Sequence, residues 1–216
     1  MKTFKNITFS NEQISKIYEV SYSISESRGK KRQNIINSVV IESLKRDITY
    51  DGCLFKTEVK IPKRKLLWGD SFPVDICVYK DYNLIEIILI KAPASNIKQN
   101  RINSLNSINS DITRLSKLDD IKISLVNFLP RITPFFMRNE IIKSFEKNSP
   151  FFLSTCGAIY KFEIDELYVT FDIANLNSCK TKLDVKNLFS TNPIKNIKIC
   201  NPTKPPLAIS QLDENW

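Results

Sequence analysis

The spacing of apolar residues predicts two helices near the start of the chain. Apolar positions recur every three or four residues from about 11 to 20 and from about 31 to 44, as in amphipathic helices. Ser10 and Asn11 are N-cap candidates for the first helix, and residues 25–29 are the expected break. In the second helix the predicted buried stripe leaves Glu42 near its edge. The members of that stripe are Ile35, Ile36, Val39, Val40 and Leu44.

The pattern then changes to the alternation of strands. A strand that begins near residue 49 runs into a basic loop at residues 60–65. Residues 72–79 (FPVDICVY) and 84–90 (LIEIILI) flank a turn at 80–83 and predict a hairpin. Because the second run is almost entirely apolar, we expect it to be central in the sheet.

Helical spacing returns at residues 95–118, followed by a strand at 121–128 and a short helix at 138–146. The first two-thirds of the chain should therefore follow the order α, β, β, β, α, β. Beyond Pro150, short alternating runs at 158–164 and 166–173 predict a hairpin, and the tail from residue 193 is rich in Pro, Asn and Lys.

These elements predict an α/β (α+β) fold with a central mixed β-sheet flanked by helices and a small C-terminal β subdomain. No repeat or long linker interrupts the 216 residues. Residues 1–150 are the expected core, and residues 151–216 form a C-terminal β and loop region of the same domain.

The charge balance points to a polyanionic partner. The chain has 32 Lys and Arg against 23 Asp and Glu, a net charge of +9. Such an excess favours nucleic acid, whose phosphates release counterions when Lys or Arg binds them. A lysine-rich surface in a protein from an AT-rich genome would give the same balance.

The residue types present exclude several classes of function. The chain has no histidine, and its five cysteines form no CxxC pair, which argues against zinc sites and Ser-His-Asp hydrolases. Its four glycines cannot build a GxGxxG or GxxxxGK[ST] loop, so no nucleotide cofactor is expected. No apolar run has the length of a signal peptide or a membrane span, and we expect a cytoplasmic protein with reduced thiols.

Asp75 and Lys91 are the leading candidates for chemistry. Asp75 stands inside one apolar strand, and Lys91 ends the next. An ionisable residue in such a run is costly unless it is paired or bound to a metal. Magnesium-dependent phosphodiester hydrolysis needs hard oxygen ligands and a cation near the phosphate, and this pair could supply both.

The sequence FPVD at residues 72–75, a turn, and then IILIKAP at residues 87–93 resembles the core motif of PD-(D/E)XK nucleases. The resemblance spans roughly residues 31–118 and implies a restriction-endonuclease-like core. In that family the first acid and the acid of the tripeptide chelate Mg²⁺, while the lysine faces the scissile phosphate. The resemblance therefore assigns Asp75 as the first acid, Lys91 as the lysine and Gln99 as the glutamine of the following helix.

The acid of the tripeptide is missing, because the tripeptide reads Leu89-Ile90-Lys91. Leu89 shares a face of the strand with Lys91, whereas Glu86 points to the other face unless a bulge intervenes. Some family members carry this acid on a nearby helix or strand. The candidates, in order of preference, are Glu42, Glu58, Glu86 and Asp111, with Asp75, Glu42 and the carbonyl of Ile90 as the expected magnesium ligands.

Basic and amide side chains along three stretches could contact phosphates or bases, although short basic runs are also typical of solvated loops. The stretches are residues 28–32, 60–65 and 195–204. The expected nucleic-acid contacts are Arg28, Lys30, Lys31, Arg32, Lys63, Arg64, Lys65, Asn96, Lys98, Gln99, Asn100 and Arg101, together with the C-terminal region.

The hypothesis that follows is a magnesium-dependent endonuclease of double-stranded DNA. Its character resembles that of a type IIP restriction enzyme, which would act as a symmetric homodimer on palindromic sites. Two alternatives stay open: a catalytically decayed relative that binds DNA or joins a complex, and a repair or RNA-directed nuclease of the same fold.

Overall fold

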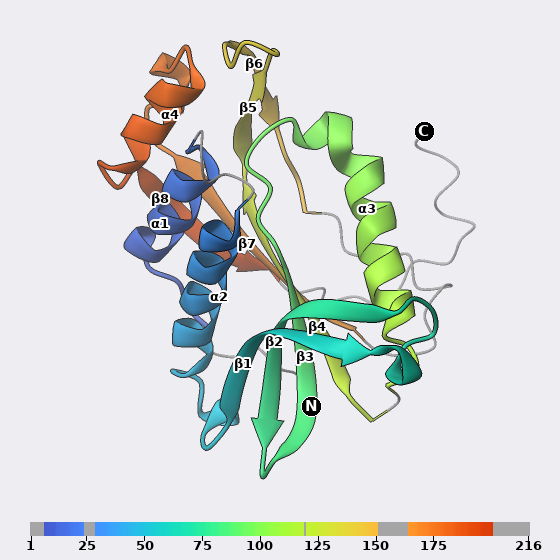
Figure 1. The fold of residues 1–216 in the computed structure, drawn as a ribbon. Coiled ribbons are helices and arrows are strands. Elements are labelled where there is room, and N and C mark those ends of the chain that lie inside the picture. Colours follow the sequence, from blue (N-terminus) through green and yellow to red (C-terminus); the bar gives the residue numbers. More distant parts are fainter. Residues whose placement is uncertain (1–6, 24–28, 119, 151–163, 201–216) are drawn as a thin grey trace, which may run out of the picture.

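The computed structural model of the chain describes residues 7–23, 29–118, 120–150 and 164–200. These residues form a mixed sheet with helices on both sides and a separate hairpin (Figure 1). The helices are α1 (Asn11–Ser21), α2 (Lys30–Leu44), α3 (Ile97–Arg114) and α4 (Lys182–Phe189), with 3-10 turns η1 (Ile48–Tyr50), η2 (Lys63–Lys65) and η4 (Leu176–Ser178). The strands are β1 (Leu54–Pro62), β2 (Ser71–Lys80), β3 (Asn83–Lys91), β4 (Lys122–Pro130), β5 (Ile132–Phe136), β6 (Ile142–Lys147), β7 (Ile164–Ile173) and β8 (Ile194–Cys200).

The main sheet has the strand order β1-β2-β3-β4-β7-β8 within the described residues. Strands β1, β2 and β3 are antiparallel neighbours, β3 pairs parallel with β4, β4 pairs parallel with β7, and β8 runs antiparallel at the edge. Helix α3 is the crossover that the parallel pair of β3 and β4 requires. The predicted order α, β, β, β, α, β and the central position of β3 are confirmed.

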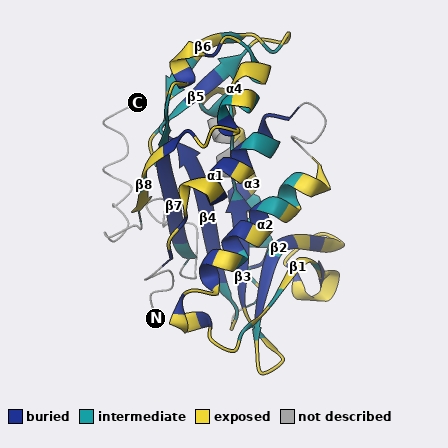
Figure 2. Cartoon of the chain, turned by 90° about the vertical axis from the view of Figure 1, so that its left-hand side faces the viewer, coloured by how far each residue is buried: buried dark blue, intermediate teal, exposed yellow. Residues whose placement is uncertain are grey.

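The two faces of the sheet are covered by different helices (Figure 1). On one face, side chains of α1, α2 and α4 pack with Val126, Phe128 and their neighbours in one core. On the other face, Ile108, Ile112 and Leu115 of α3 pack with a second core that includes Leu125. Figure 2 shows β4 and β7 buried between these layers. No helix among the described residues has both the length and the apolar character needed to cross a membrane.

Local signals explain where the first helix begins. The Ser10 hydroxyl accepts a hydrogen bond from the Gln13 amide at 3.1 Å, and the Gln13 side chain accepts one from the Ser10 amide at 2.9 Å. This reciprocal capping box satisfies donors that a helix start leaves without partners. The predicted Ser10 cap is confirmed.

The region around residues 138–146 is not the helix that its apolar spacing predicted. It contains β6, which pairs antiparallel with β5 in a second sheet. Ile142 and Phe145 have helical spacing, but β5 lies close enough to supply backbone partners, and this pairing overrides the local pattern.

The C-terminal third also differs in detail from the sequence-based expectation. Strand β7, which includes the predicted strand at 166–173, lies beside β4 in the main sheet, and β8, in the tail rich in Pro, Asn and Lys, extends that sheet. Helix α4, which the apolar pattern did not reveal, packs against α1 and begins with a capping box of Thr181 and Asp184. Most of the first strand of the predicted hairpin, residues 158–163, lies outside the described residues.

Candidate functional site

The carboxylate of Asp75 lies where β2 and β3 separate. The register between these strands runs from Lys80↔Asn83 to Ile76↔Ile88 and ends there. One residue further along β2, the Asp75 Oδ2 atom accepts a hydrogen bond from the backbone nitrogen of Ile90 at 2.7 Å. The side chain thus replaces a backbone acceptor for a buried amide, and its position is fixed at the point where the sheet opens.

Helix α2 holds the other side of the same carboxylate. Gln33 Nε2 donates to Asp75 Oδ1 at 2.9 Å, and the same nitrogen donates to Asn37 Oδ1 at 2.9 Å. Asn37 Nδ2 in turn donates to the backbone oxygen of Asp75 at 3.3 Å. Sequence reasoning missed both amides. The available signal was their spacing, because residues four apart lie on one helix face, and here that face also carries the buried Ile36 and Val40.

Lys91 and Asp111 complete the group around Asp75. The Lys91 Nζ atom lies 3.2 Å from Asp111 Oδ2, with side chains that are 33% and 19% exposed. Lys91 ends β3 and Asp111 lies on α3, so the crossover connection brings them together. We call Asp75, Lys91, Asp111 and Gln33 the Asp75 cluster.

The charges around Asp75 oppose one another. Burial raises the pKa of Asp75 above its ordinary value, while the Ile90 hydrogen bond and Lys91 pull this pKa down, and Asp111 and Glu58 push it up. Glu58 lies on β1 opposite Asp75, between the pairs Thr57↔Ile76 and Val59↔Val74, and has a positive φ of 53°. Two further carboxylates thus oppose the negative charge of Asp75, and a bound cation would relieve this repulsion.

The end of β3 is held by side chains from the first two helices. Arg32 donates to the backbone oxygen of Ala92, Tyr18 to that of Pro93 at 3.1 Å, and Tyr22 to that of Ala94. Burial raises the pKa of both tyrosines, so their hydroxyls stay protonated as donors. The backbone that carries Lys91 is therefore fixed by three consecutive bonds.

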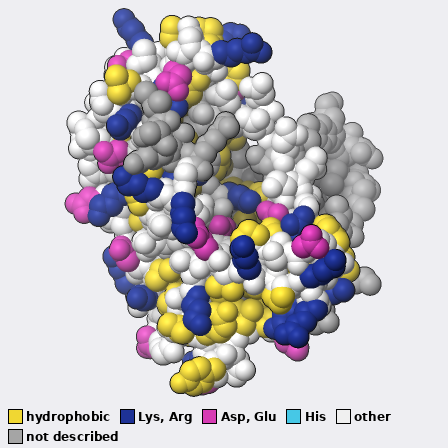
Figure 3. Space-filling model, viewed as in Figure 1, with side chains coloured by type: hydrophobic (Ala, Val, Ile, Leu, Met, Phe, Trp, Pro, Cys, Tyr) yellow, Lys and Arg dark blue, Asp and Glu magenta, His cyan; other side chains and the backbone are white. Residues whose placement is uncertain are grey.

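A cleft of about 1170 Å³ lies next to the Asp75 cluster, toward the carboxyl ends of β3 and β4. Its wall includes the cationic side chains of Arg32, Lys91, Lys98, Lys147 and Lys182, whereas Asp75 is the carboxylate in the wall. Figure 3 shows Lys and Arg side chains around the hollowed middle of this face. The excess of positive charge suits an anionic ligand.

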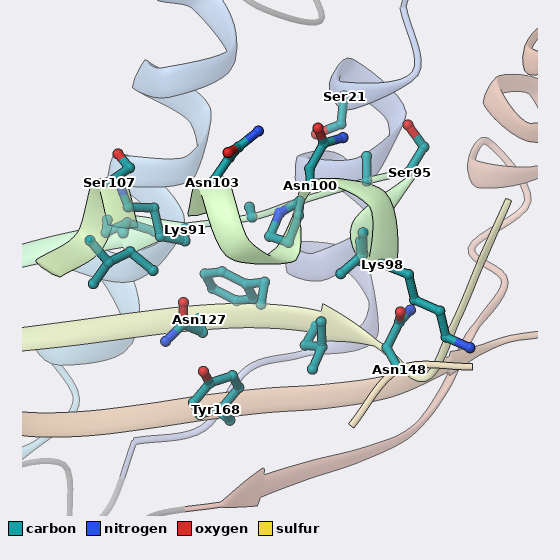
Figure 4. A pocket seen from close by; sticks show the side chains of 18 of the residues that line it. Ser21, Lys91, Ser95, Lys98, Asn100, Asn103, Ser107, Asn127, Asn148 and Tyr168 are labelled. Atoms are coloured by element: carbon teal, nitrogen blue, oxygen red, sulfur yellow. The ribbon is translucent and has the colours of Figure 1, made fainter. Parts of the chain in front are cut away.

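Amides and hydroxyls line the cleft between these charges. Figure 4 shows Asn100, Asn103 and Ser107 of α3 above Asn127 of β4 and Tyr168 of β7. Asn127 and Tyr168 were not expected site residues. The signal for Asn127 was a single amide inside the otherwise apolar run LVNFLP.

Glu42 does not lie in the Asp75 cluster, contrary to the expectation that it supplies the second acid. It is exposed, and its carboxylate accepts a hydrogen bond from Gln13 of α1 at 3.1 Å. Because each helical residue turns by about 100°, Glu42 lies roughly half a turn away from the face that carries Gln33. The acid that meets Lys91 is Asp111, the last candidate in the predicted order.

Glu86 lies on the other face of β3, as strand alternation predicted. It is buried and accepts hydrogen bonds from Tyr50 at 3.1 Å and from Ser124. A bulge does occur in β3, but it adds Ile85 between the Val78↔Glu86 and Tyr79↔Leu84 pairs. It therefore leaves the relation of Glu86 to Lys91 unchanged, and Glu86 cannot join Asp75.

The expected nucleic-acid contacts divide between the cleft and other surfaces. Arg32, Lys98 and Asn100 line the cleft, whereas Gln99 lines a separate hollow of about 650 Å³ beside β5 and β6. Gln99 is therefore not the amide beside Asp75. Gln33 occupies that place.

The other expected contacts have local roles or lie elsewhere. Asn96 exchanges hydrogen bonds with the backbone of Phe136, which ties the start of α3 to β5. Lys30 pairs with Glu58 at 3.3 Å. Lys31 is exposed on α2; Lys63, Arg64 and Lys65 form the exposed turn η2; Arg28 lies outside the described residues; and Arg101 is placed only by its backbone in α3.

The donor set limits how a metal could bind. No group of three or more His, Cys, Asp or Glu residues with metal-binding geometry occurs in the part of the chain that the structure describes. Asp75 and Asp111 nevertheless offer two hard carboxylates in the same cluster as Lys91. Magnesium usually keeps several waters and needs few protein ligands, so an oxygen-only pair completed by substrate phosphate fits this ion.

Comparison of the chain with protein-family models, curated proteins and solved structures found no match.

Proposed function

We propose that this protein binds DNA in the cleft and hydrolyses its phosphodiester bonds with Mg²⁺ at the Asp75 cluster. The proposal depends on one observation above all. A fixed carboxylate, a lysine and a second carboxylate meet beside a cleft whose wall carries several cations and the carboxylate of Asp75. This combination provides for metal binding, charge stabilisation and phosphate attraction at one place.

Asp75 and Asp111 would hold a Mg²⁺ ion, which would supply Lewis-acid chemistry for activating water and polarising the phosphate. Gln33 and the Ile90 amide orient Asp75 before substrate arrives, so little reorganisation is required. Lys91 is held by Asp111 in the absence of DNA and can turn to the phosphate, where its charge stabilises the transition state. Lys98 and Lys147 attract the flanking phosphates.

A cleavage assay on supercoiled plasmid tests this proposal. We expect cleavage with Mg²⁺, binding without cleavage with Ca²⁺, and neither nicks nor breaks with EDTA. Discrete fragments would indicate a restriction-like specificity, and random nicks a repair-like activity. A protein that neither cuts nor binds DNA under any of these conditions would contradict the proposal.

The second candidate is a DNA-binding protein of the same fold without catalytic activity. The ion pair between Lys91 and Asp111 favours it, since each group neutralises the other and the described residues hold no three-ligand site. Salt-sensitive binding to the plasmid without cleavage at any Mg²⁺ or Mn²⁺ concentration would decide for this candidate.

A further inference from the structure

A row of polar side chains crosses the cleft floor beside the Asp75 cluster. Lys91 of β3 is in register with Asn127 of β4, and Asn127 is in register with Tyr168 of β7. Aligned residues of neighbouring parallel strands project to the same face, and Figure 4 shows the three side chains on their adjacent strands. The row leads from the Asp75 cluster into the cleft.

Asn127 is the unusual member of this row. Its side chain lines the cleft but is only 5% exposed, and its Nδ2 atom has no hydrogen-bond partner among the described residues. Buried amides in folded proteins nearly always have partners, so an exception calls for an explanation. The Nδ2 atom therefore leaves this amide with a hydrogen-bond donor that a ligand could satisfy.

The surroundings of the row indicate what kind of ligand fits. The wall also contains uncharged and partly apolar side chains, among them Ile108, Leu129 and the ring of Tyr168. Lys98 and Lys147 place positive charge elsewhere on the same wall. A ligand with a flat, uncharged hydrogen-bonding part and an anionic part matches this division, and a nucleotide has both.

We infer that the Asn127 row is a nucleobase subsite, which takes the base of an unpaired nucleotide while its phosphates contact Lys98 and Lys147. This inference rests on the proposed binding of nucleic acid and specifies its form. An amide that is 5% exposed cannot reach a base edge in an intact duplex groove. The base must enter the cleft, either from a single strand or by leaving the stack.

The test compares two probes with the same number of phosphates in EDTA, where no cleavage occurs. One is a short fluorescein-labelled single-stranded oligonucleotide of mixed sequence, and the other is a fully abasic oligonucleotide of equal length. Fluorescence anisotropy gives the Kd of each. We expect the wild-type protein to bind the base-bearing probe about tenfold more tightly, as one stacked or hydrogen-bonded base provides.

Asn127→Leu should abolish this preference, so that both probes bind with the affinity of the abasic one. The same variant should melt at or above the wild-type temperature, because it removes a buried amide nitrogen without a partner. Lys98→Met should weaken the binding of both probes by the same factor and so preserve the ratio of their Kd values. Asn187→Leu, the same change at an exposed position of α4, is the matched control. It should alter neither the preference for the base-bearing probe nor the melting temperature.

Several outcomes would overturn the inference. If the wild-type protein binds both probes equally, with strong salt dependence, the base subsite is wrong while the proposed nucleic-acid binding stands. If Asn127→Leu lowers the melting temperature and keeps the preference for bases, Asn127 is a structural residue. If neither probe nor duplex DNA binds, both the subsite and the proposed function fail.

Discussion

Lys91 Nζ lies 3.2 Å from Asp111 Oδ2, so the lysine that ends β3 meets a carboxylate from the crossover helix rather than from its own strand. Strand alternation puts the buried Leu89 on the face of Lys91, where the nuclease motif would carry an acid. Helix α3 covers this face. Asp111 is therefore the carboxylate that pairs with Lys91 on this face.

Asp111→Asn should lower the cleavage rate by at least about 100-fold, the loss typical of removing one group that stabilises a transition state. The amide is nearly isosteric with the acid, so the fold should persist. Glu42→Gln is the matched control and should retain full activity, since Glu42 faces Gln13 instead of the cluster. Single-turnover plasmid cleavage with Mg²⁺ measures both. Loss of activity in Glu42→Gln alone would show that the second acid is misassigned.

Replacements of Asp75 should separate chemistry from stability. Asp75→Asn and Asp75→Ala should both abolish cleavage. Only the alanine variant leaves the Ile90 amide without its acceptor, which should lower the free energy of unfolding by about 1–3 kcal/mol. Urea denaturation compares the two variants. Equal stability of the two would mean that the hydrogen bond to Ile90 contributes nothing measurable.

Lys91→Met should reduce the rate constant by about 100- to 1000-fold while weakening DNA binding by less than about tenfold. The reason is that one positioned charge acts mainly when charge develops on the phosphate. Lys98 is a cation of the same cleft that lies outside the Asp75 cluster. Lys98→Met should therefore weaken DNA binding more than it reduces the rate constant. Cleavage at saturating enzyme measures the rate constant, and fluorescence anisotropy with Ca²⁺ measures the Kd for DNA. A purely affinity-based effect of Lys91→Met would make it an ordinary phosphate contact.

DNA affinity should fall steeply with salt between about 50 and 200 mM. The variants Lys98→Met and Lys147→Met should each reduce the slope of log K against log salt by about one, since each removes one phosphate contact. Lys45→Met removes the same charge from an exposed position just after α2 and should leave the slope unchanged. A flat salt response of the wild-type protein would contradict phosphate binding.

Glu86 should make stability depend on pH. Burial raises its pKa above the ordinary value of 4.5, although Lys122, Ser124 and Tyr50 act against this shift. The folded state therefore favours the protonated acid, and this contribution is complete below about pH 4.5 and lost as pH rises through the folded pKa. Thermal melts should therefore show that the melting temperature of Glu86→Gln rises relative to that of the wild type as the pH goes from acid to neutral. A constant difference would mean that Glu86 has the same pKa folded and unfolded.

The sequence by itself determined the elements whose signals are local. The alternation in residues 72–90 gave the β2–β3 hairpin, helical spacing gave α1, α2 and α3, and strand alternation put Leu89 and Lys91 together and Glu86 opposite. Each of these follows from side-chain periodicity within one element. Where a neighbouring strand competed with that periodicity, as in β6, the prediction was wrong.

Only the tertiary structure decided which elements share a site. The choice of Asp111 over Glu42 depends on how far α2 and α3 are rotated about their axes, and the row from Lys91 to Asn127 and Tyr168 depends on the register of three strands far apart in sequence. A rotation or a register is set by the packing of whole faces in the two cores. The residues of one strand or helix therefore cannot reveal it alone.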